Sequence, residues 1–157
     1  MKTLLGTLAL GALLALSSIA IAADTPDPVV GTWKLDAAKS KGNVPLPKSE
    51  TRVYTAAPGG VALTWTRVAA DDKESTVKTT FKYDGKDYPV TGSPEFDSLS
   101  AKRIDAHTIE SKQKRMGKDV GTTTRTVSAD GKTLTLASKL KTAKGEEADT
   151  SMVYDRQ

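Results

Sequence analysis

Few side chains in this sequence have the types and spacing that catalysis requires. His107 is the only histidine and the chain has no cysteine, so these residue types cannot assemble a zinc or thiol site. Asp71-Asp72 and Glu146-Glu147 are adjacent carboxylates, but neighbours in a strand point to opposite faces, and both pairs fall near turns. We therefore expect no catalytic residue, no metal and no cofactor, and a protein that is not an enzyme.

A second candidate is the basic segment KQKRMGK, which begins at Lys112 and gathers cations around one predicted hairpin tip: Lys112, Lys114, Arg115 and Lys118. One interpretation is a solvated strand face, and the other is a weak contact with an anionic envelope surface. The formal net charge of +4 is small and evenly spread, and aromatic residues are sparse. We therefore expect no nucleic-acid partner.

Hydroxyl and amide side chains share strand faces with large apolar residues. Because strand residues alternate between faces, the polar ones should point inward with them: Thr79 with Phe81 and Tyr83, Ser111 and Gln113 with Ile109, Thr122 and Thr124 with Val120, and Ser138 with Leu136. A dry core rarely holds so many hydroxyls, because each needs a hydrogen-bond partner. A cavity with water or a ligand supplies partners. The alternative is that one β-bulge reverses a face and places these hydroxyls outside.

The elements that position these residues follow a leader. Lys2 precedes an apolar run from Leu4 to Leu16 and the small residues Ala20-Ile21-Ala22, a pattern typical of a secretory signal peptide. The apolar run is shorter than the roughly 20 residues that span a bilayer. We expect residues 1–22 to be cleaved and residues 23–157 to form one exported, soluble domain, periplasmic or secreted. Without cysteines, its core alone must stabilise it.

Turn signals such as Asp84-Gly85 and Asp130-Gly131 recur along the mature chain, and Asp-Gly supplies the positive φ angles of tight hairpins. The alternating segments between turns predict nine strands, near 29–36, 49–57, 60–70, 74–83, 98–104, 107–115, 119–128, 132–140 and 147–155. A closed meander needs an even number, and Tyr88–Thr91 could supply a tenth strand, with a gap at Pro89. We expect an all-β, antiparallel up-and-down barrel of about 9–10 strands. An open nine-stranded sandwich is the alternative.

The two ends of the mature chain carry a family resemblance. The opening VGTWKL holds Gly31 and Trp33, and the last strand reads SMVYDRQ. The opening resembles the Gly-x-Trp signature of lipocalins, and the ending is similar to that of intracellular fatty-acid-binding proteins, so residues 23–157 resemble a lipocalin-like barrel of the calycin superfamily. The resemblance implies that Trp33 closes the barrel floor, with Arg156 stacked on its ring.

The resemblance also implies a ligand cup, and this chain departs from the family there. The carboxylate anchor of the fatty-acid-binding proteins is Arg-x-Tyr on the last strand, whereas this chain keeps Tyr154 and has Met152 in place of the arginine. A carboxylate buried without a cation costs several kcal/mol. We therefore expect a small hydrophobic or weakly polar ligand rather than a fatty acid.

The connection 37–48 is too short for the two helices that close fatty-acid-binding proteins. Its prolines favour an extended stretch from which Val44 and Leu46 both face the cup, as a lid; a solvated strap pinned to the rim is the alternative. In an up-and-down barrel the connections after odd-numbered strands gather at one end, so we expect this segment at the same end as the turns at Asp71-Asp72 and Asp130-Gly131.

The predicted function is binding of a small apolar or amphipathic molecule by a monomer. The alternative is a structural or interaction barrel of the cell envelope with a side-chain-filled core. The predicted ligand-binding residues are Val44, Leu46, Trp65, Thr79, Phe81, Tyr83, Ser111, Gln113, Thr122, Thr124 and Tyr154.

Overall fold

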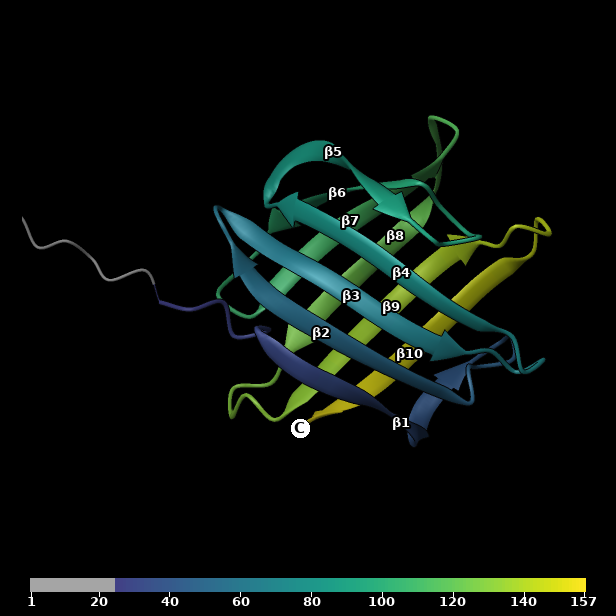
Figure 1. Cartoon of the computed structure of the whole chain (residues 1–157), viewed down its shortest axis with the longest axis horizontal. Helices are drawn as coiled ribbons and strands as arrows, with labels where there is room; N and C mark the ends of the chain where they lie inside the picture. Colours follow the sequence, from purple (N-terminus) through teal and green to yellow (C-terminus); the bar gives the residue numbers. More distant parts are fainter. Residues whose placement is uncertain (1–24) are drawn as a thin grey trace, which may run out of the picture.

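The computed structural model describes residues 25–157 as ten strands in one closed barrel (Figure 1). Each strand pairs antiparallel with its neighbours along the chain, and the first pairs with the last. The strands are β1 (Gly31–Gly42), β2 (Ser49–Ala57), β3 (Gly60–Val68), β4 (Glu74–Lys82), β5 (Asp84–Thr91), β6 (Ser98–Arg103), β7 (Thr108–Arg115), β8 (Lys118–Val127), β9 (Thr133–Lys141) and β10 (Glu147–Arg156). The predicted signal peptide, residues 1–22, lies outside the described residues. No helix within residues 25–157 is long and apolar enough to cross a membrane.

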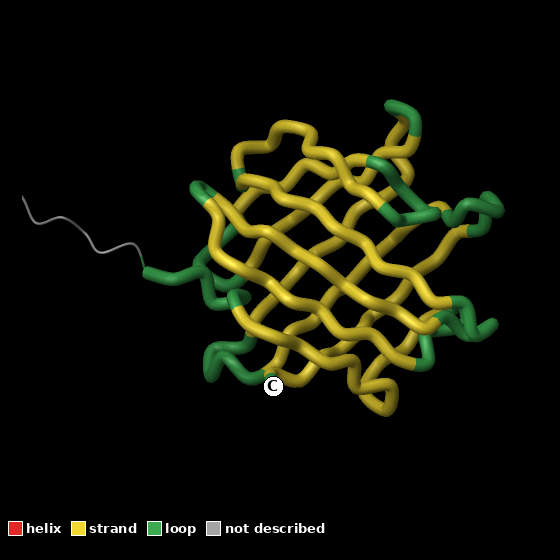
Figure 2. Tube along the Cα trace, in the orientation of Figure 1, coloured by secondary structure: helices red, strands yellow, loops and turns green. Residues whose placement is uncertain are grey.

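The barrel follows from side-chain alternation along its strands. In β3, Val61, Leu63 and Trp65 are buried, while the residues between them are more exposed. β4 repeats the pattern, with Val77 and Phe81 among its buried residues. Each strand therefore turns one apolar face inward, and the strands of the near and far walls cross one another (Figure 2). The predicted all-β, antiparallel up-and-down barrel is confirmed, and its closure excludes the open sandwich.

The tenth strand is β5, which is longer than the segment Tyr88–Thr91 that the sequence suggested. It pairs with β4 at only two positions, Lys78 with Thr91 and Thr79 with Val90, and it bows away from β4 in Figure 1. Pro89 has no N–H to donate to a ladder. The weak point of the sheet therefore lies between β4 and β5, at the proline where a gap was expected.

β1 continues to Gly42, so the predicted long connection 37–48 is wrong and the actual connection is 43–48. The register of β1 against β10 shifts between Asp36 and Lys41. Within this bulge the Ser40 hydroxyl donates to the Asp36 carbonyl at 2.7 Å and accepts from the Val153 N–H at 2.9 Å. The Ser40 hydroxyl takes the place of the backbone groups that would bond Asp36 and Val153 in a regular ladder. The second half of β1, which reads as a loop in the sequence, therefore stays in the sheet. We call residues 43–48 the lid segment.

The two ends of the barrel differ. The connections after β1, β3, β5 and β9 line one open end, which we call the mouth. The N-terminal segment and the turns after even-numbered strands lie at the opposite, closed end (Figure 1). The turn at Asp130-Gly131 follows β8 and belongs to the closed end, so its predicted position beside Asp71-Asp72 is wrong. The reason is β5, because one additional strand reverses the end at which every later turn lies.

Trp33 and Arg156 lie at the closed end. The Trp33 side chain is fully buried, and its indole N–H donates to the Val29 carbonyl at 2.7 Å. The guanidinium carbon of Arg156 lies 4.2 Å from the Trp33 ring centroid, and Arg156 donates to the Gly131 and Val30 carbonyls. Gly31 has φ of +139°, and a Cβ there would lie 2.5 Å from Nη1 of Arg156. The glycine therefore makes room for the arginine that covers the tryptophan.

Candidate functional site

A cavity of about 960 Å³ occupies the barrel interior and opens at the mouth. Leu63, Trp65, Val77 and Phe81, from β3 and β4, line one wall, which we call the apolar wall. Phe96, from the connection after β5, also lines the cavity, and its ring centroid lies 6.4 Å from that of Trp65. Buried aromatic and aliphatic side chains around an open space can hold an apolar molecule by contact alone.

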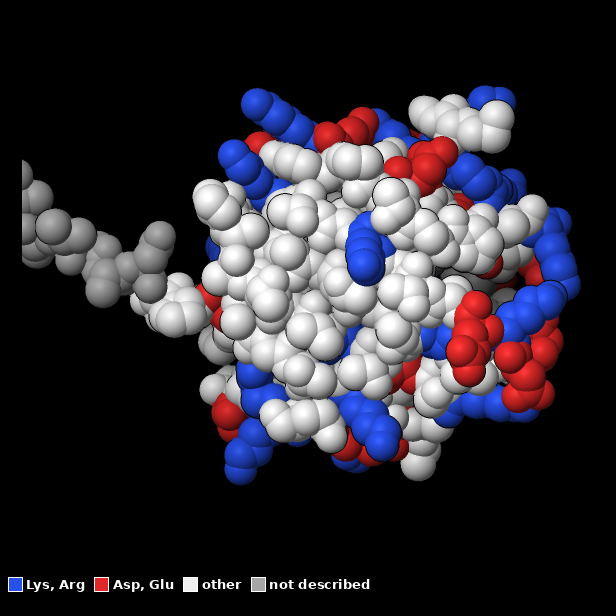
Figure 3. Space-filling view, viewed as in Figure 1, with Lys and Arg blue, Asp and Glu red and all other residues white. Residues whose placement is uncertain are grey.

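The lid segment lies at the mouth, and both Val44 and Leu46 line the cavity. It is attached at each end. The Asn43 side chain bonds backbone groups of Glu147 and Asp149, and the Lys48 N–H donates to the Val68 carbonyl at 2.9 Å. Charged side chains of both signs surround this end of the molecule, whereas the outer face of β2 to β4 is mostly uncharged (Figure 3). The placement is compatible with both a lid and a strap.

A buried ionic network occupies the wall formed by β2, β3 and β10. Glu50 is 1% exposed. It accepts from Nε of Arg52 at 2.6 Å, from the Tyr154 hydroxyl at 2.8 Å, and from Arg67. Burial alone would raise the pKa of Glu50, but the charges of Arg52 and Arg67 hold it below its ordinary value. Glu50 is therefore an anion that holds two guanidinium groups in place.

Arg52 and Arg67 bring positive charge to the cavity, because both line it. The guanidinium of Arg52 lies 4.8 Å from the Trp65 ring centroid and 5.4 Å from that of Tyr154. Tyr154 is fully buried behind Arg52 and does not line the cavity, so its predicted contact with ligand is wrong. Burial raises the pKa of the Tyr154 hydroxyl, which keeps it a neutral donor to Glu50.

The absence of an arginine at position 152 does not leave the cup without cations. Met152 lines the cavity at the position where the family has arginine, yet Arg52, Arg67 and Arg125 reach the same space from β2, β3 and β8. The prediction considered only position 152 of the last strand. In a barrel, an inward-facing residue of any strand can supply a positive charge to the cavity.

A second ionic cluster lies toward the closed end. Asp27 accepts from the Tyr83 hydroxyl at 2.5 Å and from Arg103 at 3.0 Å, and Arg125 lies 3.6 Å away. Burial would raise the pKa of Asp27, but hydrogen bonds from Tyr83 and Val29 and the two arginine charges hold it below its ordinary value. Burial raises the pKa of Tyr83 to about 12. Tyr83 does not line the cavity, which corrects its predicted role; it binds the N-terminal segment to the barrel.

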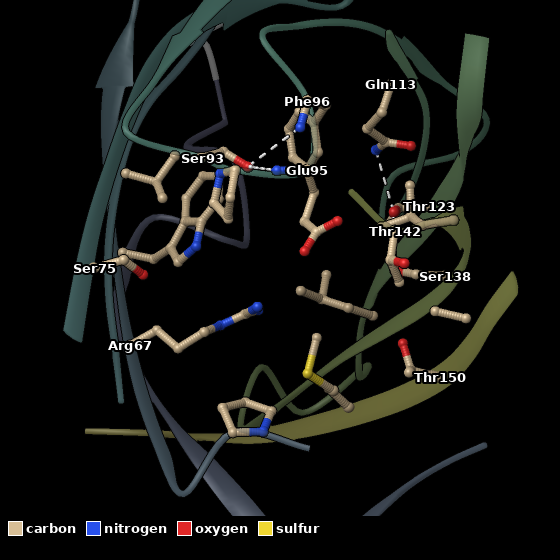
Figure 4. A pocket seen from close by; sticks show the side chains of 18 of the residues that line it. Arg67, Ser75, Ser93, Glu95, Phe96, Gln113, Thr123, Ser138, Thr142 and Thr150 are labelled. Carbon is tan, nitrogen blue, oxygen red and sulfur yellow. Dashed lines mark hydrogen bonds between the residues drawn. The ribbon is translucent and has the colours of Figure 1, made fainter. Parts of the chain in front are cut away.

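Opposite the apolar wall lies a hydrogen-bonded group of four side chains from β7, β8 and β9, which we call the polar patch: Ser111, Gln113, Thr123 and Ser138. Figure 4 labels the last three. Nε2 of Gln113 donates to Oγ of Ser111 at 3.0 Å and to Oγ1 of Thr123 at 3.1 Å. The hydroxyls of Thr123 and Ser138 are 2.9 Å apart. Among residues 25–157, two buried side-chain atoms have no partner, Oε1 of Gln113 and Nε of Arg125.

The prediction that Thr122 and Thr124 line the cup is wrong. Thr122 is exposed, and Thr123 and Arg125 line the cavity instead. Gln113 pairs with Gly121 and Lys114 with Asp119, so Val120 is an extra residue that reverses the faces of β8. A Cβ on Gly121 would lie 2.1 Å from the Lys139 carbonyl oxygen. An isolated glycine in a strand pattern was the available signal of this bulge.

Thr79 is also misplaced in the prediction. It is 6% exposed, but its hydroxyl donates to the Pro89 carbonyl at 2.9 Å, and it does not line the cavity. Its bond satisfies a carbonyl next to the gap between β4 and β5. Thr79 therefore supports the wall from within the sheet, while Trp65, Phe81, Ser111 and Gln113 line the cavity as the alternation of their strands indicated.

The basic hairpin does not form one cationic surface. Lys114 forms an ion pair with Asp87 at 2.7 Å. Arg115 is half-buried and donates to the Glu95 and Thr142 carbonyls. Lys112 and Lys118 are exposed. Partners elsewhere in the chain engage two of the four charges, so the tip is a weaker candidate for an anionic surface than its sequence suggests.

Sequence reasoning missed the charged residues of the interior. Arg52 shares its strand face with Tyr54, and Arg67 shares its face with Trp65, so alternation could have identified both. Arg125 was hidden by the bulge in β8, which reversed its predicted face. Glu50 pairs with Arg52 two residues away on β2 and with Arg67 on the neighbouring strand β3, whereas Asp27, the partner of Arg125, lies far away in the sequence.

The site offers binding groups more readily than catalytic ones. His107 is exposed at the turn between β6 and β7. Within the described part of the chain, no group of three or more His, Asp or Glu side chains could hold a metal ion. What the geometry supplies is a large cavity with an apolar wall, a polar patch and buried charges fixed by hydrogen bonds.

Comparisons with known proteins identify a similar fold at low sequence identity. No family model matches the chain, and no curated protein matches it. The solved structure of the zebrafish ileal bile acid-binding protein, complexed with cholic acid, is similar with a TM-score of 0.49 and 13% identity over 83% of this chain and 99% of that one. The described chain is a closed barrel of ten antiparallel strands in which β1 pairs with β10.

Proposed function

We propose that this protein binds a small apolar or amphipathic molecule in the barrel cavity and does not act as an enzyme. The observation that carries the proposal is the cavity itself, about 960 Å³ and open at the mouth. Small-molecule sites usually measure about 300–1,000 Å³ and combine apolar walls with a few polar groups. A space of this size does not support the alternative of a barrel filled with side chains.

The polar groups inside also support a ligand. Oε1 of Gln113 and Nε of Arg125 are buried without a protein partner among the described residues. Each such group costs about 1–3 kcal/mol when it stays unsatisfied. Both atoms are closed to solvent, but the polar patch and the three arginines line the cavity and offer other polar atoms to a ligand.

The charged side chains around the cavity favour a ligand that is neutral or carries at most one negative group. Arg52, Arg67 and Arg125 line the space, and Glu50 and Asp27 balance two of the three charges from behind. Because the arginines already have anionic partners, a ligand charge is not required to stabilise them.

We further propose that the protein acts after export, as a monomer. The support is the leader pattern of residues 1–22, with its apolar run and small residues before Ala23. Expression of the full chain in a bacterial host, followed by fractionation and mass measurement, tests this. A mature mass that begins near Ala23 in the periplasmic or secreted fraction is expected, and an intact cytoplasmic chain would contradict it.

Binding is tested with N-phenyl-1-naphthylamine, a neutral probe whose fluorescence rises in apolar surroundings. Thr150 lines the cavity (Figure 4), so Thr150→Trp should occupy part of the space and lower probe affinity several-fold. The matched control Thr122→Trp changes an exposed threonine and should leave affinity unchanged. Equal affinities in all three proteins would contradict binding in the cavity. Native mass spectrometry of protein purified from its natural source would show any co-purifying ligand.

A further inference from the structure

We propose that the mouth of the cavity recognises a carboxamide group on an otherwise apolar ligand, with Arg67 donating to its carbonyl oxygen and Glu95 accepting from its N–H. The inference rests on the proposed function, because it specifies the ligand class of the same cavity. It depends on where these two charged side chains point and on which of their atoms a ligand can reach.

Arg67 presents N–H groups to the cavity close to the mouth. It is the second-last residue of β3, so it lies nearer the mouth than Trp65 and Leu63 on the same inward face. Its Nε donates to Glu50, and among residues 25–157 neither Nη1 nor Nη2 has a hydrogen-bond partner. Figure 4 shows the side chain pointing into the cavity, and it is 29% exposed. The carboxylate therefore fixes the guanidinium while its outer nitrogens stay accessible.

Glu95 presents an acceptor to the same space from the connection after β5. Its Oε2 accepts from the Ala143 N–H at 2.7 Å, and its backbone carbonyl accepts from Arg115 at 3.1 Å. Figure 4 shows the half-buried carboxylate directed into the cavity. Within the described chain Oε1 of Glu95 has no partner, and the enclosed atoms without a partner are those of Gln113 and Arg125. Oε1 of Glu95 is therefore open to a ligand.

The two side chains face one space without bonding each other. The ion pair of Arg67 is with Glu50, and Glu95 forms none among residues 25–157. An amide carries an acceptor and a donor on neighbouring atoms, so its carbonyl can face Arg67 while its N–H faces Glu95. A carboxylate only accepts and would meet the negative charge of Glu95, and an ammonium group would meet the charge of Arg67.

The charges around this headgroup position balance. Arg52 and Arg67 are matched by Glu50 behind them and by Glu95 across the space. Solvent screens the exposed charged side chains of the rim: Asp71, Lys73, Glu74, Lys144 and Glu146. A neutral headgroup with a dipole is therefore favoured over an ion.

An apolar body fits below the headgroup. The apolar wall continues from Arg67 toward the closed end, because Trp65 and Leu63 follow it along the inward face of β3. Phe96, which is next to Glu95, packs against Trp65 with ring centroids 6.4 Å apart. The ligand class is thus an apolar body that enters first and a carboxamide that stays at the mouth.

The experiment titrates three fluorescent probes at pH 7. They share a pyrene body and a short alkyl chain and differ in the headgroup: 1-pyrenebutanamide, 1-pyrenebutanoate and 1-butylpyrene. Glu95→Gln keeps one oxygen for the Ala143 N–H and replaces the other by NH2. It should weaken the amide probe about tenfold, the effect of one hydrogen bond, strengthen binding of the carboxylate probe and leave 1-butylpyrene unchanged.

Arg67→Met should weaken the amide and the carboxylate probes and leave 1-butylpyrene unchanged. Glu50 keeps Arg52 and Tyr154 as partners in this variant. Glu110→Gln and Lys78→Met are the matched controls, because they change the same charges at exposed positions that do not line the cavity. Neither control should change the affinity of any probe.

The outcomes separate the two proposals. If no probe binds the unmutated protein, the proposed function and this inference both fail. If all three bind and Glu95→Gln changes their affinities equally, the cavity binds apolar bodies without recognising the headgroup, and this inference alone is overturned. Tighter binding of the carboxylate than of the amide by the unmutated protein also overturns it. Thermal melting shows whether each variant is folded, and the opposite responses to Glu95→Gln test the inference if Arg67→Met is not.

Discussion

Replacement of Trp33 by alanine tests how the closed end stabilises the barrel. The indole is fully buried and donates to the Val29 carbonyl at 2.7 Å, and the Arg156 guanidinium lies 4.2 Å from its ring centroid. Trp→Ala substitutions in cores cost about 3–5 kcal/mol. We expect Trp33→Ala to lower the free energy of unfolding by that amount, because it removes the buried ring and leaves the face of the Arg156 guanidinium without its packing partner.

Trp33→Phe separates the ring from its hydrogen bond. Phenylalanine keeps most of the buried surface and removes the N–H, which leaves the Val29 carbonyl without this donor. We expect a loss of about 1–2 kcal/mol. Trp65→Ala is the matched control, because Trp65 is also buried but borders the cavity. Its ring has open space on one side and fewer packing contacts to lose, so its replacement should cost less than that of Trp33.

The assay is urea unfolding followed by far-ultraviolet circular dichroism, which does not depend on either tryptophan. The chain has only two tryptophans, so Trp65 fluorescence gives a second, independent transition in the Trp33 variants. Coincident transitions justify a two-state free energy. A loss below about 1 kcal/mol for Trp33→Ala, or a larger loss for Trp65→Ala, would refute the assignment of Trp33 as the closing residue of the barrel.

Three further predictions concern the lid, the buried carboxylates and the last strand. Val44→Ser with Leu46→Ser should leave the melting temperature nearly unchanged, increase amide exchange in residues 43–48 and weaken retention of N-phenyl-1-naphthylamine; a much lower melting temperature with intact binding would identify a strap. The pKa values of Asp27 and Glu50 are held below their ordinary values, so their contribution to stability is complete above about pH 4 and is lost as the pH falls through their folded-state pKa values. Urea midpoints measured from pH 6 to pH 2 should therefore decline at the acid end, and a flat profile would contradict the buried ion pairs. Met152→Arg adds a buried cation beside the arginine network, so it should raise dodecanoate affinity and lower the melting temperature; unchanged affinity would show that position 152 does not contact the bound carboxylate.

Local patterns were sufficient for the wall residues whose strands have no bulge. Alternation in β3, β4 and β7 correctly indicated that Trp65, Phe81, Ser111 and Gln113 line the interior. The same rule misplaced the threonines of β8, because Val120 is an extra residue. A one-residue change in register moves every later side chain of a strand to the opposite face. The alternation within β8 was therefore correct, but its threonines were assigned to the wrong face.

The charged interior shows a different limit. Arg125 lies near Asp27, and Glu50 holds both Arg52 and Arg67. A charge is tolerated in a core only when a partner compensates it. From the sequence these residues resemble solvated charges, because their burial and the contacts of Asp27 with Arg125 and of Glu50 with Tyr154 arise only after the barrel closes.

The sequence by itself determined the strand-forming segments, their apolar faces and the Gly-x-Trp opening, because side-chain alternation and turn propensity act between near neighbours. Only the tertiary structure decided that β5 is a full strand, which end each later turn occupies, which wall of the cavity is polar and where its charges find partners. These properties depend on pairing between strands that are distant in sequence. In a closed sheet each strand's register is set by both of its neighbours together, and no single segment contains that information.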